Sequence, residues 1–149
     1  AANLGAVGIF DIYNEDIFVV VKNFTGGVKK ISKDGKVLDI LSNINAPSNI
    51  CFDKNGNFVL QESWTNDGAT YQIYKIYSSS GQFIGNITDN QNTLIVSGEN
   101  AVFTPLNIDS HNNLHFSHNS FTSNSNGITN CNPITNQPGI WKLSMVQKN

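Results

Sequence analysis

An internal repeat constrains the fold of this chain more than any other feature of its 149 residues. A pattern of an aliphatic residue, a variable residue, Lys, another aliphatic residue and then Ser or Tyr occurs at Val28–Ser32, Ile73–Tyr77 and Ile140–Ser144. Self-similarity of this kind predicts an architecture in which copies of one supersecondary unit pack against one another.

Each copy of the pattern has the same neighbours in the sequence. An acidic turn and an apolar segment precede it, and in the first two copies a Gly-containing turn and another apolar segment follow. Asn-Gly and Asp-Gly between apolar segments are strong hairpin signals. The expected unit therefore has four strands, with the repeated Lys in the third. The acidic turns are Phe10–Asp16, Phe52–Asn57 and Ile108–Asn113, and the fourth strands are Val37–Leu41 and Phe83–Ile87.

The strands are apolar on both faces, which favours one all-β architecture. A sheet with one solvated face would alternate apolar and polar residues, whereas Ile17–Val21 and Ile73–Tyr77 do not. Four-stranded antiparallel sheets covered on both faces are the blades of a β-propeller. We expect one all-β domain, a partial or half propeller of about three blades at about 5–45, 46–93 and 94–149, the last without its fourth strand.

The repeated lysines have a structural explanation in this architecture. Lys30, Lys75 and Lys142 are expected to lay their aliphatic stems along the surface between blades, with the ammonium groups at the edge. The pattern then recurs because the third strand of each blade meets the same environment. A ligand shared by all three lysines is the alternative.

The middle unit resembles a blade of the NHL-type β-propeller repeat. Pro47–Leu60 contains a Pro, an apolar stretch, Asp-Lys-Asn-Gly-Asn and an apolar strand, and Glu62 occupies the acidic end of that strand. The unit is similar also to blades of gluconolactonase-like and streptogramin-lyase-like propellers. The resemblance covers the middle unit well, the first moderately and the third poorly. It implies a closed ring of about six or seven blades.

Three blades cannot close such a ring, so an apolar sheet edge and an apolar blade face need cover. Two copies of the chain could form a six-bladed ring about a two-fold axis. Alternatively, the chain is part of a longer polypeptide, or its sheets stack in an open arrangement. The segment 3–10 could also pair with the last sheet and supply its missing strand.

Composition excludes some functions and favours a compartment. Charged residues make up 13% of the chain and the net charge is -2, which argues against a nucleic-acid partner. No apolar run is long enough to span a membrane. Low charge and a start without Met favour a secreted or cell-envelope protein. Cys51 is expected in the core, while Cys131 lies in a polar segment, and a bridge between them is the less favoured possibility.

A binding rim is expected at the end of the blades where the second and third strands connect, because family resemblance implies that this end carries the site. These connections lengthen along the chain, and the segment 119–138 is either a lid or a passive insertion. Aromatic and polar residues at this rim could hold a sugar or peptide by stacking and hydrogen bonding. The rim candidates are Phe24, Trp64, Asn66, Asp67 and Phe121.

A metal or acid–base site is the competing possibility. Aligning the second strands places Glu62 and His118 in one column with Val21, so Glu62 and His118 could converge near the ring mouth. His115 and His118 point to opposite faces of their strand, which makes a three-His site within that segment geometrically poor. The lactonase-like resemblance implies Ca²⁺ or Mg²⁺ with Glu62, Asn66, Asp67 and His118 as candidate ligands, although no cofactor is expected on the first interpretation.

The sequence thus predicts a non-enzymatic propeller module that binds a protein, peptide or glycan, with a second copy or another chain completing the ring. One alternative is a divalent-metal-dependent hydrolase or lyase whose site another chain completes. Another is a structural segment of a larger assembly. Val21, at a position where an enzyme would need a ligand, favours binding over chemistry.

Overall fold

The computed structural model describes residues 6–22, 25–88, 96–97, 101–120 and 139–144. Strands are the only regular secondary structure in these ranges, as the sequence predicts. They are β1 (Val7–Tyr13), β2 (Asp16–Val21), β3 (Thr25–Ile31), β4 (Val37–Asn45), β5 (Ile50–Phe52), β6 (Asn57–Asn66), β7 (Ala69–Ser78), β8 (Phe83–Asn86), β9 (Val96–Ser97), β10 (Ala101–Ile108), β11 (Asn113–Ser120) and β12 (Gly139–Ser144).

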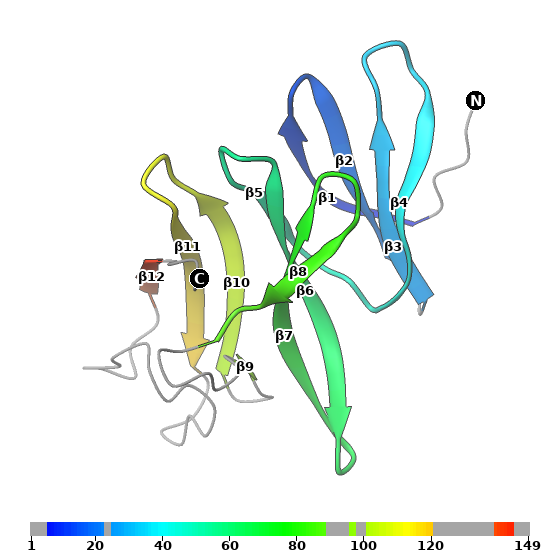
Figure 1. Ribbon diagram of the computed structural model, residues 1–149. Coiled ribbons are helices and arrows are strands. Elements are labelled where there is room, and N and C mark those ends of the chain that lie inside the picture. Colours follow the sequence, from blue (N-terminus) through cyan, green and yellow to red (C-terminus); the bar gives the residue numbers. More distant parts are fainter. Residues whose placement is uncertain (1–5, 23–24, 89–95, 98–100, 121–138, 145–149) are drawn as a thin grey trace.

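The strands form three antiparallel sheets that follow one another along the chain (Figure 1). The first sheet contains β1 to β4 in order, and the third contains β10, β11 and β12. The second contains β5 to β8 in order, and the short β9 pairs with β7 further along the edge that also pairs with β8. Strands β1 and β10 both lie against β5. The sheets therefore fan out from a row of first strands, as the blades of a partial propeller do. The predicted all-β fold of about three blades is confirmed, whereas β9 was not predicted.

The N-terminal strand belongs to the first sheet. β1 pairs with β2 through Phe10–Val19 and Ile12–Ile17. Asn14 and Glu15, with φ of 49° and 65°, form the tight turn between them. The expectation that the segment 3–10 completes the last sheet is therefore wrong for residues 7–10. Pairing across a two-residue turn closes a much shorter loop than pairing with a distant strand, so it costs less conformational entropy.

The strand register revises the explanation of the repeated lysines. Ile17, Phe58 and Leu114 are the second residues of β2, β6 and β11, and they pair with Ile31, Tyr77 and Leu143. In this register Lys30 corresponds to Lys142, but Lys75 corresponds to Lys29. Because side chains alternate along a strand, Lys75 lies on one face of the second sheet and Lys30 lies on the opposite, non-equivalent face of the first. The third strands therefore do not place all three lysines in one environment.

The acidic turns of the second and third sheets share one hydrogen-bond pattern. The Oδ1 atom of Asp53 accepts hydrogen bonds from the backbone N–H groups of Asn55 and Asn57, each at 2.8 Å. Asp109 accepts from the corresponding positions 111 and 113, each at 2.9 Å. These bonds are Asx-turn hydrogen bonds within the predicted acidic turns, and they fix where β6 and β11 begin.

The main core lies between the first and second sheets. We call the face of each sheet that is turned toward the next sheet its forward face, and the opposite face its rear face. Phe18, Val20 and Val28 on the forward face of the first sheet cluster with buried residues of the second sheet. That rear-face set is Ile50, Phe52, Phe58, Leu60 and Tyr77.

Aromatic rings connect the two sheets. Phe18 contacts Phe52 and Phe58 at centroid separations of 4.5 and 6.3 Å, and Tyr13 stacks on Phe52 at 5.2 Å. Close contacts of this kind stabilise a single packing of the two sheets. The third sheet covers the other side of the second, with β10 against β5 and β6.

Candidate functional site

The second sheet carries a long hairpin at the end where the rim was expected. β6 and β7 pair without a break from Asn57–Ser78 to Asn66–Ala69. Asp67 and Gly68, with φ of 50° and 79°, form the turn. Positive φ at both central residues is the type I′ geometry that Asp-Gly favours. The connection that carries the rim candidates Trp64, Asn66 and Asp67 is therefore a strand pair with a two-residue turn. Trp64 and Asn66 belong to β6, and Asp67 lies in the turn.

This hairpin extends beyond the corresponding part of the first sheet. β2 ends at Val21, which corresponds to Glu62 in the shared register. β6 continues for one more run, Ser63–Asn66, against Ala69–Gln72. Figure 1 shows the tip of the β6–β7 hairpin projecting past the neighbouring strands. The remaining rim candidates, Phe24 and Phe121, lie outside the described residues.

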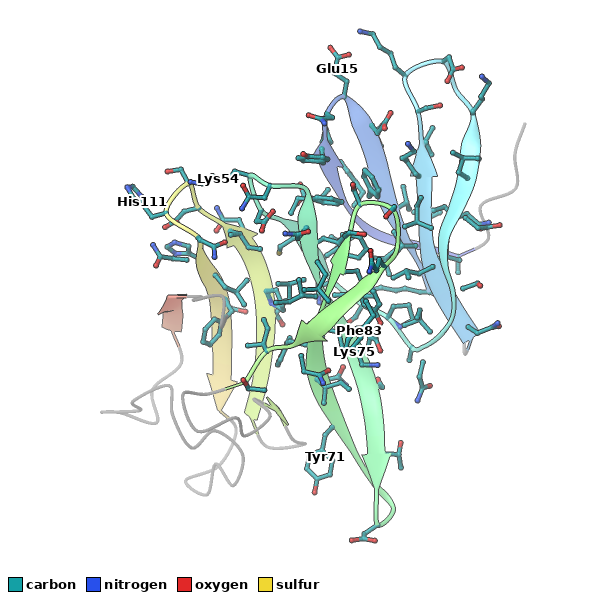
Figure 2. All side chains as sticks on the ribbon, in the orientation of Figure 1. Glu15, Lys54, Tyr71, Lys75, Phe83 and His111 are labelled. Carbon is teal, nitrogen blue, oxygen red and sulfur yellow. The ribbon has the colours of Figure 1, made fainter. Side chains whose placement is uncertain are left out.

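In the projecting part, two aromatic residues occupy paired backbone positions. Trp64 pairs directly with Tyr71, and Ser63 with Gln72. Tyr71 lies near the hairpin tip in Figure 2 and is half-buried. Tyr71 was not among the residues predicted from the sequence. The sequence feature that could have predicted the pairing of Tyr71 with Trp64 is the Asp67-Gly68 turn signal. A two-residue turn places residues at equal distances on either side of it opposite each other.

Glu62 is buried at the base of the projecting part, with 3% of its surface exposed. The hydroxyl of Tyr77 donates a hydrogen bond to its Oε1 at 2.6 Å, and the Nζ of Lys75 forms an ion pair with its Oε2 at 2.8 Å. All three residues lie on the rear face of the second sheet. Burial first, and then the hydrogen bond to Glu62, raises the pKa of Tyr77 well above its ordinary value.

This arrangement gives Glu62 a structural environment. Both carboxylate oxygens have a partner within the same sheet, and buried charges require such pairing. The register confirms that Val21, Glu62 and His118 occupy equivalent positions in β2, β6 and β11. Glu62, however, faces the first sheet, whereas the backbone of His118 belongs to the third. The second sheet therefore stands between the carboxylate and that backbone, and the side chain of His118 lies outside the described part.

A second polar cluster lies in the third sheet. The Oδ2 atom of Asp109 is 3.0 Å from Nε2 of His115 and accepts a hydrogen bond from the amide nitrogen of Asn113 at 2.9 Å. The contact with His115 first, and then those with Asn113, hold the pKa of Asp109 well below its usual range. The sequence predicts Asp109 in an acidic turn but does not predict its contact with His115, because that contact joins a turn to a diagonal position in the following strand.

The described part of the structure holds neither a cluster of metal ligands nor a membrane-spanning helix. Among the residues with described positions, no group of three or more His, Cys, Asp or Glu side chains could hold a metal ion. The same residues include no helix of the length and hydropathy needed to cross a bilayer. Cys51 is a buried free thiol, as expected for a core residue. Burial, with a smaller contribution from the charge of Asp11, raises the pKa of Cys51 to about 12.

Comparisons with known proteins identify no relative of this chain. No protein-family model, no curated protein and no solved structure matches the chain. The resemblance of the middle unit to NHL-type blades therefore stays a prediction from the sequence, and the identity that the structure supports is that of an all-β chain built from propeller-type blades.

Proposed function

We propose that this chain is a non-enzymatic propeller module that binds a protein, peptide or glycan at the tip of the β6–β7 hairpin. The observation that carries the proposal is the projection of that hairpin, with Trp64 and Tyr71 opposite each other in the ladder. Aromatic pairs beside hydroxyl and amide groups suit ligands that combine apolar faces with hydrogen-bonding edges. Thr65 and Asp67 are exposed next to this pair.

The environment of Glu62 supports binding over chemistry. A general acid or base must reach a substrate, and a carboxylate ligand must offer an oxygen to its cation. Glu62 is buried, and its oxygens already contact Tyr77 and Lys75. Use of Glu62 in a lactonase-like site would therefore require both contacts to break. The proposal includes export to a secreted or cell-envelope location, where a module rich in uncharged polar residues would meet such ligands.

Arrays of glycans and a displayed peptide library, probed with the full chain, test the proposal. Ligands that bind are then measured by calorimetry against Trp64→Ala and Tyr71→Ala. Each variant is expected to weaken binding by roughly 10-fold or more, because aromatic anchors dominate small interfaces. Phe83→Ala is the matched control, since Phe83 is an exposed aromatic residue on the outer strand β8, away from the hairpin tip.

Two results would contradict the proposal. The first is a bound ligand whose affinity is unchanged in both hairpin variants while their circular dichroism spectra match that of the wild type. The second is stoichiometric Ca²⁺ or Mg²⁺ in the purified chain that Glu62→Gln removes, together with metal-dependent hydrolysis of a lactone. That outcome would favour the enzymatic alternative instead.

A further inference from the structure

The rear face of the first sheet is an exposed apolar surface. β1 and β2 contribute to it in register, with Val7 opposite Val21, Phe10 opposite Val19 and Ile12 opposite Ile17. We call the exposed members of this set the rear patch. They are Val7, Phe10, Ile12 and Ile17, with exposed fractions of 50, 58, 56 and 37%. Val19 and Val21 on the same face are buried, so the exposed apolar side chains come from β1 and the start of β2. Exposed apolar side chains gathered on one sheet face mark an interaction surface.

The register shows that the rear patch is equivalent to a buried surface of the same chain. Phe10, Ile12 and Ile17 correspond to Ile50, Phe52 and Phe58 in the second sheet. Those three residues are at most 8% exposed, because the forward face of the first sheet covers them. The rear patch is therefore a blade face of the same apolar type that lacks its cover.

The opposite end of the chain does not offer a suitable cover. The forward face of the third sheet is the face that a head-to-tail ring of two copies would place on the rear patch. By register, β11 contributes Asn113, His115 and Ser117 to this face, opposite Asn107 and Thr104 of β10. Asn113 and His115 already contact Asp109. Aliphatic side chains pressed onto this face would still remove water from its polar groups and offer no hydrogen bonds in exchange.

We propose that the rear patch binds the rear patch of a second copy, so that two chains form a face-to-face dimer about a two-fold axis. An apolar surface is complementary to itself, as such an axis requires. Beside the patch, Lys29 and Asp39 form an ion pair on the same face, so their charges cancel and two copies can meet there without like-charge repulsion. This inference concerns assembly and stands independently of the ligand at the β6–β7 hairpin.

The size of the face sets the expected strength of the dimer. A face of four strands about 4.8 Å apart and about six residues long covers roughly 400 Å² in each copy. The total of about 800 Å² is below the usual range of stable interfaces, so we expect a dissociation constant on the order of 10 µM. Sedimentation velocity over about 1 to 500 µM full chain should show a reversible shift from monomer to dimer.

Charge substitutions in the patch distinguish the two-fold dimer from the other arrangements. Ile12→Lys and Ile12→Asp should each weaken self-association by about 100-fold, because each introduces like charges into an apolar interface. Mixing the two variants should restore a dimer, since a two-fold axis brings the same patch of both chains together. Ile84→Lys, which changes another exposed Ile on the outer strand β8, should leave the dimer intact.

The proposal is overturned by a chain that stays monomeric up to the highest concentration. It is overturned equally by a dimer that Ser117→Arg abolishes and Ile12→Lys leaves intact, because that result would place the third sheet in the interface. Failure of the Lys and Asp variants to associate when mixed, with both folded by circular dichroism, would also count against it. A loss of binding at the hairpin tip would leave all three of these readouts unchanged.

Discussion

The buried ion pair between Glu62 and Lys75 predicts a large and asymmetric response to substitution. The side chain of Glu62 is 4% exposed and that of Lys75 is 29% exposed. Lys75→Met removes the cation and leaves a carboxylate in the interface between two sheets. Breaking a buried pair in this way typically costs 3–5 kcal/mol, and the partial exposure of Lys75 places the expected loss of unfolding free energy at about 3 kcal/mol. For a chain of this size that is roughly 6–12 °C in melting temperature.

The reverse substitution should be milder. Glu62→Gln keeps an oxygen that can accept the hydrogen bond from Tyr77, and Lys75 can turn its ammonium group to solvent, so we expect a loss of about 1 kcal/mol. The double variant, which has no charge at either position, should lose about 1 kcal/mol as well, because the uncompensated carboxylate is gone. The coupling free energy of the cycle is then about 3 kcal/mol.

Urea unfolding followed by intrinsic fluorescence measures all four proteins at pH 7. Lys30→Met is the matched control, since Lys30 pairs with Asp16 at 3.1 Å but both side chains are about a quarter exposed. We expect the control to lose no more than about 1 kcal/mol. A loss for Lys75→Met as small as that of the control, or strict additivity in the double variant, would refute the assignment of Glu62 to a buried structural pair.

Three further predictions concern pH, thiol chemistry and turns. The pKa of Asp109 lies below its usual 3.8, so the folded state binds fewer protons than the unfolded state. The stability that this carboxylate contributes should therefore be present above about pH 4 and decline as the pH falls. Asp109→Asn should reduce this decline in urea midpoints measured from about pH 6 downward. Cys51, in a variant whose other cysteine is Ser, should react with a disulfide reagent at pH 8 about 1,000-fold more slowly in the folded state than in urea, and equal rates would contradict its burial. Gly68→Ala should cost about 1 kcal/mol, since φ is 79° and no heavy atom beyond the adjacent residues lies within 4 Å of the added methyl group. Gly56→Ala should cost more, because its methyl group would lie 2.7 Å from the ring of Tyr13. Calorimetric melting of both variants checks this order.

Local signals in the sequence predicted most of the strands and turns. Asp-Gly at Asp67 and Asn-Gly at Asn55 marked two connections, and the structure has a turn at both. The apolar runs between such signals became β2, β6 and β11. These features are predictable because turn geometry and strand alternation depend on residues only a few positions apart.

The register between strands was harder to predict. The pattern at Ile73–Tyr77 matched the one at Val28–Ser32 by residue type, yet pairing aligns Tyr74–Ser78 with Val28–Ser32. Both alignments place aliphatic or aromatic residues around a Lys, so the sequence alone does not separate them. A shift of one residue moves every side chain to the other face. The face of Lys75, and with it the ion pair to Glu62, became visible only in the folded sheet.

The amino-acid sequence by itself determined an all-β chain made of repeated four-stranded units whose sheets need cover on both faces. The tertiary structure decided which of those faces receives cover. It buries Phe58 beneath the first sheet, leaves Ile17 at the equivalent position of the first sheet exposed, and turns Glu62 toward Tyr77. The physical reason is the range of the interactions. Alternation and turn chemistry act within one strand pair, whereas burial depends on which sheet lies opposite, and only the packing of the whole chain settles that.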